Sequence, residues 1–490
     1  MVGLTGFGGY VPRLRLSRKS AADANGWIQP GVKRFGKGER SICNWDEDSI
    51  TMAVEAARDC LEDRPESLIA SIYMGSTTFP FQDRQNGGIV AAALNLDENL
   101  STVDIGASQR AGTSALGAAL DAAKGLDDKQ VLVVASDARR ARAGAQDEMI
   151  FGDGAASLLV GNTGVVADLL GRHSVAVDFV DHYRGENRAY DYNWEERWIR
   201  DEGILKIVPE AINATLSKFG VSPNDVNTLI VPSAMKRVPA KIAKMTGISE
   251  DALMESMDGV IGETGSAHPL LMLSLALESA EAGQVIVVAS FGQGCDVLIF
   301  KVTDAIKSYK KNVGVSGYIA RRREETNYGK FMAFNDLVVQ EKGMRAELDN
   351  QTALTQLYRR RDMLNGLVGG ECEKCGTRQF PRSRVCVNPN CNEMNSQKPF
   401  VFSNIPAKIM TWSADHLTYC PDPPLHYGMI QFDGGGRFLA NFTDADVGKV
   451  GVGQDVRMMF RIKDFDNNRG FRRYFWKAAP ALANEAQNNG

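Results

Sequence analysis

Short apolar runs alternate with alanine-rich stretches along the first 305 residues of the chain. The apolar runs include ASIYMGS at 70–76 and QVLVVASD at 130–137, and the alanine-rich stretches include ALGAALDAAKG at 115–125. A continuous apolar run bounded by turn residues indicates a buried strand, whereas a periodic apolar stripe indicates a helix. Their alternation predicts an α/β domain with a layered sheet.

The same order of segments occurs twice in this region. Residues 113–138 and residues 269–294 each read as an Ala/Leu-rich helix, a short turn and a Val-rich buried strand. Internal similarity of this kind indicates a duplicated α/β unit. We expect the first half at residues 1–165 and the second half at residues 166–305.

The pattern changes after residue 305. Residues 306–370 are predicted to form a linker and a helical segment, because Lys and Arg are frequent and the helix-like stretch 351–370 ends in Gly369 and Gly370. Residues 401–480 hold short alternating runs separated by Gly and Asp turns. Those runs predict a small antiparallel barrel.

Composition narrows the class of protein. Hydrophobic residues make up 44% and charged residues 24% of 490 residues, which suits a globular chain of several domains. The net charge of -4 gives no pull toward nucleic acid. The N-terminal residues lack a signal-peptide pattern, and no uncharged apolar run of about 18 residues predicts a membrane span. We therefore expect a cytoplasmic protein with neither a nucleic-acid nor a membrane partner.

Four of the eight cysteines are clustered in two pairs. Cys372 and Cys375 form the first pair, Cys386 and Cys391 form the second, and ten residues separate the pairs. Four thiolates on two tight turns are typical of a structural Zn²⁺ site, which predicts a zinc ribbon at residues 371–400. The alternatives are a redox dithiol and an iron–sulfur cluster.

The first 305 residues resemble the thiolase superfamily in its branch of HMG-CoA synthases and ketoacyl-ACP synthases III. The matching segments are YMGSTT, DIGASQRAGTSAL, FGDGAASLLVG, DVNTLIVPSAMKRVPAKIAKMTG, GETGSAHPLLMLSLA and VVASFGQG. The C-terminal part, with GECEKCGTRQFPRSRVC and RGFRRYFWKA, resembles the zinc-ribbon and OB-fold domains associated with acyl-CoA enzymes. The resemblance implies a duplicated α-β-α-β-α fold, a coenzyme A thioester as substrate, a homodimer and a thiolase as a further partner.

The residues that this family uses in catalysis are replaced. The resemblance aligns Ser108 with the nucleophilic cysteine, Pro232 with the histidine, Glu263 with the asparagine and Thr77 with the acid/base glutamate. A serine hydroxyl is a weak nucleophile without a general base. The replacements therefore argue against Claisen condensation through a cysteinyl thioester.

Other polar groups are candidates for the chemistry. Glu263 and His268 lie five residues apart, so a carboxylate and an imidazole could face one pocket and share a proton. The helix start at Ser108 and the backbone near Gly292 and Gly294 could supply oxyanion donors. Structural interpretations stand beside these: His268 caps a helix or satisfies the core, Glu263 supports its loop, and Ser108 is a small residue in a crowded turn.

Two further segments bear on substrate binding. Lys236, Arg237 and Lys241 suit the phosphates of CoA, although an exposed helical face carries the same charges. The segment around His182 is rich in Tyr and Trp, and by resemblance it walls the acyl pocket. Plain packing explains those aromatic residues equally well.

Three functions fit the sequence. The first is a lyase or synthase that cleaves or forms a C–C bond of an acyl-CoA by aldol chemistry, without an acyl-enzyme. The second is an HMG-CoA synthase-like acyltransferase in which Ser108 or a nearby residue takes the acyl group. The third is a non-catalytic, CoA-binding partner of an active thiolase.

Overall fold

The computed structural model describes residues 1–62 and 64–482, which fall into two compact units. The first unit comprises Met1–Asn44, Asp48–Val90 and Leu96–Val338. The second unit comprises the chain from Val339 onward together with two short segments, Trp45–Glu47 and Ala91–Asn95. Among the described residues, no helix has both the length and the apolar character needed to cross a membrane.

The first unit is built on a nine-stranded sheet in the order β11-β12-β13-β8-β1-β7-β6-β4-β5. The strands of its first half are β1 (Gly3–Tyr10), β4 (Ile69–Gly75), β5 (Ser101–Ile105), β6 (Gln130–Ala138) and β7 (Asp153–Gly161). Those of its second half are β8 (Ala167–Ala176), β11 (Val226–Ile230), β12 (Val285–Phe291) and β13 (Gly294–Val302). The halves meet where the first residues of β1 pair with the first residues of β8.

Strand order and direction confirm the duplication. In the first half β4 and β6 are parallel, and β6–β7 and β7–β1 are antiparallel. In the second half β11 and β12 are parallel, and β12–β13 and β13–β8 are antiparallel. The halves differ at the outer edge: β4 pairs with a whole strand, β5, whereas β11 has in that place an isolated parallel bridge between Leu229 and Leu253.

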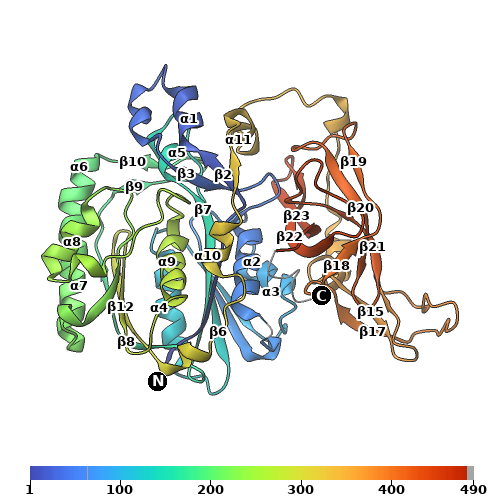
Figure 1. Cartoon of the computed structure of the whole chain (residues 1–490), viewed down its shortest axis with the longest axis horizontal. Helices are drawn as coiled ribbons and strands as arrows, with labels where there is room; N and C mark the ends of the chain where they lie inside the picture. Colours follow the sequence, from blue (N-terminus) through green and yellow to red (C-terminus); the bar gives the residue numbers. More distant parts are fainter. Residues whose placement is uncertain (63, 483–490) are drawn as a thin grey trace. The chain divides into compact units, whose positions relative to one another are not determined.

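Helices cover both faces of each half of the sheet. The main ones are α2 (Ser49–Leu61), α4 (Ala111–Ala123), α7 (Leu205–Phe219) and α9 (His268–Leu277). A Cβ on Gly8 of β1 would meet α2, and one on Gly9 would meet α9, so these helices lie on opposite faces. Figure 1 shows the layers in the order α7, second half of the sheet, α4 with α9, first half, α2. The predicted α-β-α-β-α layering is therefore confirmed.

The structure corrects the expected linker after residue 305. Strand β14 (Arg323–Glu325) pairs with β2 (Leu14–Ser17), which also pairs with β3 (Glu39–Ile42). Tyr328 and Phe331 of α11 (Tyr328–Phe334) are buried in a core cluster with residues of β2. These buried aromatic side chains, not the frequent Lys and Arg, decide the structure of the segment. The other elements of this unit are α1 (Arg18–Asn25), α5 (Gln146–Ile150), α6 (Glu196–Trp198), α8 (Val238–Thr246), α10 (Gly314–Ala320), β9 (His182–Tyr183) and β10 (Tyr192–Asn193). Helix α3 (Asn86–Ala93) begins in this unit, and its residues from Ala91 onward belong to the second unit.

The second unit holds two antiparallel sheets. One consists of β15 (Val368–Cys372), β16 (Arg378–Gln379) and β17 (Gln397–Val401). The other consists of β18 (Ala407–Ile409), β19 (Ser413–Asp415), β20 (Leu425–Phe432), β21 (Arg437–Asn441), β22 (Asp455–Asp466) and β23 (Phe471–Pro480). Its strand order does not close into a ring, so the sheet is an open OB-type barrel.

The helical segment expected at 351–370 is shorter than predicted. Helices α12 (Leu354–Arg359) and α13 (Arg361–Leu364) end early, and Gly369 lies inside β15. A Cβ on Gly369 would come within 2.4 Å of the Phe402 ring and 2.5 Å of the Gln379 carbonyl oxygen. Close packing, rather than the end of a helix, therefore explains this glycine.

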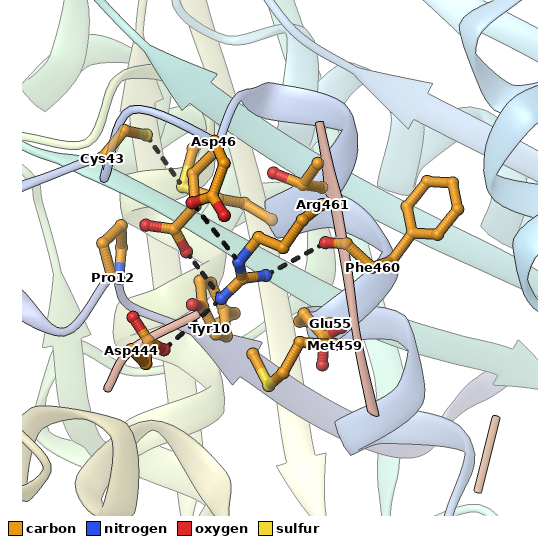
Figure 2. A network of polar contacts seen from close by, with 12 residues as sticks. Tyr10, Pro12, Cys43, Asp46, Glu55, Asp444, Met459, Phe460 and Arg461 are labelled. Atoms are coloured by element: carbon orange, nitrogen blue, oxygen red, sulfur yellow. Dashed lines mark hydrogen bonds and ion pairs between the residues drawn. The ribbon is translucent and has the colours of Figure 1, made fainter. Parts of the chain in front are cut away.

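Buried charges are paired inside the second unit (Figure 2). The Arg461 guanidinium lies 3.1 Å from Glu47 and 3.5 Å from Asp444, and it donates to the Phe460 carbonyl. Lys477 binds Asp46 at 2.8 Å. These ion pairs attach the segment Trp45–Glu47 to strands β22 and β23, which is why it belongs to this unit.

Candidate functional site

The start of α4 is held by hydrogen bonds to the turn between β12 and β13. The Ser108 hydroxyl donates to the Gly292 carbonyl oxygen at 2.9 Å, and Arg110 Nε donates to the same oxygen at 2.8 Å. Arg110 also forms an ion pair with Asp296 at 2.8 Å. The residue before Ser108, Ala107, has a φ of 66°. Ser108 thus fixes a crowded turn, and its proton is directed at a carbonyl rather than at a base.

The expected oxyanion donor at Gly292 is already used. Its N–H donates to the Gly294 carbonyl oxygen at 3.0 Å. The proposed role of this backbone is therefore not supported in the observed conformation, because an oxyanion hole requires N–H groups free to reach the substrate.

Glu263 is bound by a buried arginine. Its Oε2 lies 2.7 Å from Arg139 Nη1, and its Oε1 accepts from the Gly265 N–H at 2.8 Å. Arg139 also binds Asp191 at 2.9 Å, and its guanidinium lies 3.7 Å from the centre of the Phe151 ring. Burial lowers the pKa of Arg139, but Glu263 and Asp191 more than offset burial, so this pKa is raised.

Arg184 continues the same network. It binds Asp191 at 2.8 Å and donates to the Thr77 carbonyl oxygen. Two cations and two carboxylates, Arg139, Arg184, Asp191 and Glu263, therefore form a balanced group. One member, Glu263, stands at a position where the family resemblance places a catalyst. Glu263 has a structural partner for each oxygen.

The structure does not join Glu263 to His268. His268 is completely buried at the start of α9, and its Nδ1 accepts from the Thr264 N–H at 3.1 Å. Neither residue has the other among its hydrogen bonds in the described chain. The five-residue spacing suggested that Glu263 and His268 share a proton, but the 3₁₀ turn Gly265–Ala267 separates the two side chains.

Thr77 acts together with its neighbours on a buried aspartate. Asp137 Oδ1 accepts from the Thr77 N–H at 2.8 Å and from the hydroxyls of Ser76 and Thr78 at 3.0 and 2.8 Å. Its Oδ2 accepts from the Ser266 hydroxyl at 2.7 Å. Asp137 therefore ties the loop after β4 to the loop before α9. Pro232, two residues past β11, is half-buried.

An imidazole that sequence reasoning did not identify as catalytic lies beside the start of α4. His182 Nδ1 is 3.0 Å from Asp181 Oδ2, and His182 Nε2 is 3.3 Å from Gln109 Nε2. Asp181 also accepts from Gln293 Nε2 at 3.1 Å. The sequence signal for this site is the Asp181-His182 dipeptide, which places a carboxylate next to an imidazole. The contact with Gln109 could not be predicted, because the two residues are 73 positions apart.

The basic candidates lie at the start of α8. Lys236, Arg237 and Lys241 are exposed, and Arg237 stands just before the helix with a φ of 66°. None of the three has an ion pair among the residues that the structure describes. They are therefore available to a phosphate, although exposure alone does not make them a site.

The four clustered cysteines converge in the second unit. Their sulfur atoms all lie within 4.8 Å of one another, with Cys372–Cys391 at 3.9 Å and Cys375–Cys386 at 3.5 Å. Zn–S bonds of about 2.3 Å in a tetrahedron place sulfurs about 3.8 Å apart. The arrangement fits a structural zinc site formed by Cys372, Cys375, Cys386 and Cys391.

Comparisons with known proteins agree with this architecture. Residues 216–300 match the model of the 3-oxoacyl-[acyl-carrier-protein] synthase III C-terminal domain. Residues 364–393 match the rubredoxin-like zinc ribbon domain of ChsH2, and residues 403–461 match its C-terminal OB-fold domain. The first unit is thus a thiolase-like condensing-enzyme fold, and the second unit combines a zinc ribbon with an OB-fold.

Individual relatives support the same class. The hydroxymethylglutaryl-CoA synthase of Methanocaldococcus jannaschii is 27% identical over 346 residues, which cover 68% of this chain and 98% of that protein. The enzyme of Thermococcus gammatolerans is 28% identical over 331 residues, covering 66% and 93%. A solved HMG-CoA synthase complexed with CoA superposes with a TM-score of 0.59 at 18% identity, covering 70% of this chain and 92% of that one. FabH from Pseudomonas aeruginosa gives a TM-score of 0.53 at 20% identity, covering 62% and 98%. The last two show the fold alone.

Proposed function

We propose that this protein binds an acyl-CoA and forms or cleaves a C–C bond beside the thioester by aldol chemistry, without an acyl-enzyme. The hydroxymethylglutaryl-CoA synthases that it resembles, and the CoA complex of one such structure, support a CoA thioester as substrate. Ser108 carries the proposal, because its hydroxyl donates to the Gly292 carbonyl oxygen and, among the described residues, makes no hydrogen bond to a base. Aldol chemistry requires an enolate and a proton carrier but no nucleophile on the protein.

The cysteines of the first unit support the absence of an acyl-enzyme. Burial raises the pKa of Cys60 to about 12 and also raises the pKa of Cys295, which disfavours a thiolate at either position. Cys43 is half-buried with its sulfur 3.7 Å from that of Met52. None of the three lies at the start of α4, where an acyl-accepting thiol would gain most from the helix dipole.

We place the CoA phosphates at the start of α8. Lys236, Arg237 and Lys241 are exposed there and offer three cations to the pyrophosphate and ribose phosphate. Changing Lys241 to Glu is expected to weaken CoA binding at least tenfold in calorimetry, whereas Lys218→Glu on α7 should leave it unchanged. Equal affinities for the two variants would remove the phosphates from this helix.

A test of the reaction type follows the α-protons of acetyl-CoA and propionyl-CoA in D₂O by proton NMR. Enolate formation replaces these protons with deuterium, and intact mass spectrometry detects any acyl adduct. We expect exchange without an adduct, and exchange that survives Ser108→Ala. An acylated Ser108 would instead establish the HMG-CoA synthase-like acyltransferase.

The non-catalytic alternative has one observation in its favour. Arg139 and Arg184 neutralise Asp191 and Glu263, so the carboxylate at one of the family's catalytic positions, Glu263, is held in an ion pair. CoA binding without exchange, together with a thiolase that copurifies in stoichiometric amount, would support this partner role. Homodimerisation and a cytoplasmic location remain predictions, and light scattering of the purified chain tests the first.

A further inference from the structure

We infer that His182, held between Asp181 and Gln109, is the acid–base group that moves the α-proton of the bound acyl-CoA. This inference rests on the proposed function and adds to it the residue that performs the proton transfer. Neither Glu263 nor His268, the pair expected from the sequence, has a nitrogen or oxygen both free and accessible. His182 is half-buried and lies directly beside the start of α4.

Asp181 fixes the orientation and tautomer of the ring. Its Oδ2 lies 3.0 Å from His182 Nδ1, so Nδ1 is the nitrogen that donates to the carboxylate, and Nε2 is the nitrogen that carries the lone pair whenever the ring is neutral. The other oxygen of Asp181 accepts from Gln293, and its backbone carbonyl accepts from the Trp194 N–H at 2.9 Å. Burial raises the pKa of Asp181, but the hydrogen bond and charge of His182 more than offset burial, so this pKa lies below its ordinary value.

Further charged groups surround the imidazole. Asp147 of α5 and Asp191 interact electrostatically with His182, and their cation partners are Arg139 and Arg184. Charges of both signs therefore lie around the imidazole.

Gln109 can serve both protonation states of His182. Its Nε2 lies 3.3 Å from His182 Nε2 and donates to the neutral ring, while its Oε1 is buried and has no hydrogen-bond partner. Once Nε2 is protonated, a half-turn of the amide would bring Oε1 to accept from it. That rotation breaks no other hydrogen bond of the side chain, because Oε1 makes none.

The step is balanced as follows. Gln109 Nε2 turns away from His182 Nε2, and the lone pair released on His182 Nε2 takes a proton from the carbon next to the thioester. The electron pair of that C–H bond becomes the C=C bond of the enolate, and the thioester oxygen takes the negative charge. For cleavage in the reverse direction, Nε2–H returns its proton to the enolate carbon.

The experiment measures α-proton exchange of acetyl-CoA and propionyl-CoA in D₂O with the full chain. His182→Gln is expected to slow exchange at least ~100-fold, the usual contribution of a general base, while CoA affinity and the melting temperature stay at wild-type values. His173→Gln, the same change on β8 of the first unit, is the matched control and should exchange normally. His182→Ala should recover exchange when imidazole is added, which a purely structural role would not allow.

The outcomes separate the inference from the proposed function. If the wild type exchanges and His182→Gln exchanges equally fast, the inference is wrong while the aldol proposal stands. If the wild type binds CoA but exchanges neither probe, both are overturned. Loss of α-proton exchange in His182→Gln, together with recovery of exchange when imidazole is added to His182→Ala, establishes the inference.

Discussion

Replacing Arg139 with methionine is expected to destabilise the first unit by about 3–5 kcal/mol, the usual cost of leaving a buried charge without its partner. The Arg139 side chain is 6% exposed and binds carboxylates of Asp191, 3% exposed, and Glu263, 19% exposed. Methionine keeps contact with Phe151 but removes the only guanidinium that the described structure places on Glu263. Burial raises the pKa of Asp191, but Arg139, Arg184 and His182 together more than offset burial, so this pKa is lowered and the variant loses the part that Arg139 contributes.

Calorimetry of the purified chain measures the effect. Unfolding entropy of about 2.1 cal/mol/K per residue gives about 0.7 kcal/mol/K for a unit of roughly 330 residues, so the transition should fall by about 4–7 °C. Arg140→Met is the matched control. Arg140 and its partner Asp336 are 42% and 74% exposed and 3.6 Å apart, and a pair of this kind contributes little.

A second variant tests the cause. In Arg139→Met, Asp191 keeps its ion pair with Arg184, whereas Glu263 is left without a cation. Adding Glu263→Gln removes that uncompensated charge, so the double variant should be more stable than Arg139→Met alone. Equal melting temperatures for Arg139→Met and Arg140→Met would contradict an electrostatic cause. A further loss of stability when Glu263→Gln is added to Arg139→Met would contradict it as well.

Three more outcomes are expected. Cys372→Ser should bind less than one zinc atom per chain and should lower the melting temperature of the second unit. Cys420→Ser should keep the metal, and elemental analysis of both purified variants measures the zinc content. Burial raises the pKa of Asp258, so the folded state loses stability as pH rises through that pKa. Asp258→Asn should therefore raise the melting temperature near neutral pH but not below about pH 3.9, and an equal gain at both would contradict this. Gly112→Ala would put a Cβ 2.2 Å from a backbone oxygen and should lower the melting temperature of the first unit. Gly117→Ala on the same helix meets only the movable end of an arginine side chain and should lower it less. Equal melting temperatures for the two variants would refute the steric explanation.

Local patterns predicted much of the architecture. The Cys372–Cys375 and Cys386–Cys391 pairs are set by short spacings, and the two helix-turn-strand repeats marked both halves of the sheet. Each signal lies within about 30 residues of sequence, where periodicity and turn chemistry are informative. The aromatic residues of α11 were missed because their core partners in β2, Leu14 and Leu16, lie more than 300 residues earlier in the chain.

The site was harder to predict, because its contacts are distant in sequence. Glu263 is bound by Arg139, which lies 124 residues away, and this partner turns a candidate base into half of an ion pair. His268 was expected to exchange protons, but the Thr264 backbone occupies its Nδ1. Gln109 follows the residue singled out as the nucleophile, yet only the fold shows that it meets His182.

The ion pair between Arg139 and Glu263 also constrains how this sequence can change over generations. A substitution that removes Arg139 leaves Glu263 without a cation, whereas a substitution that removes Glu263 leaves Arg139 still paired with Asp191. Selection should therefore reject the loss of Arg139 while Glu263 is present. Positions 139 and 263 are therefore expected to vary together among descendants of this gene, and the order of mutation should matter.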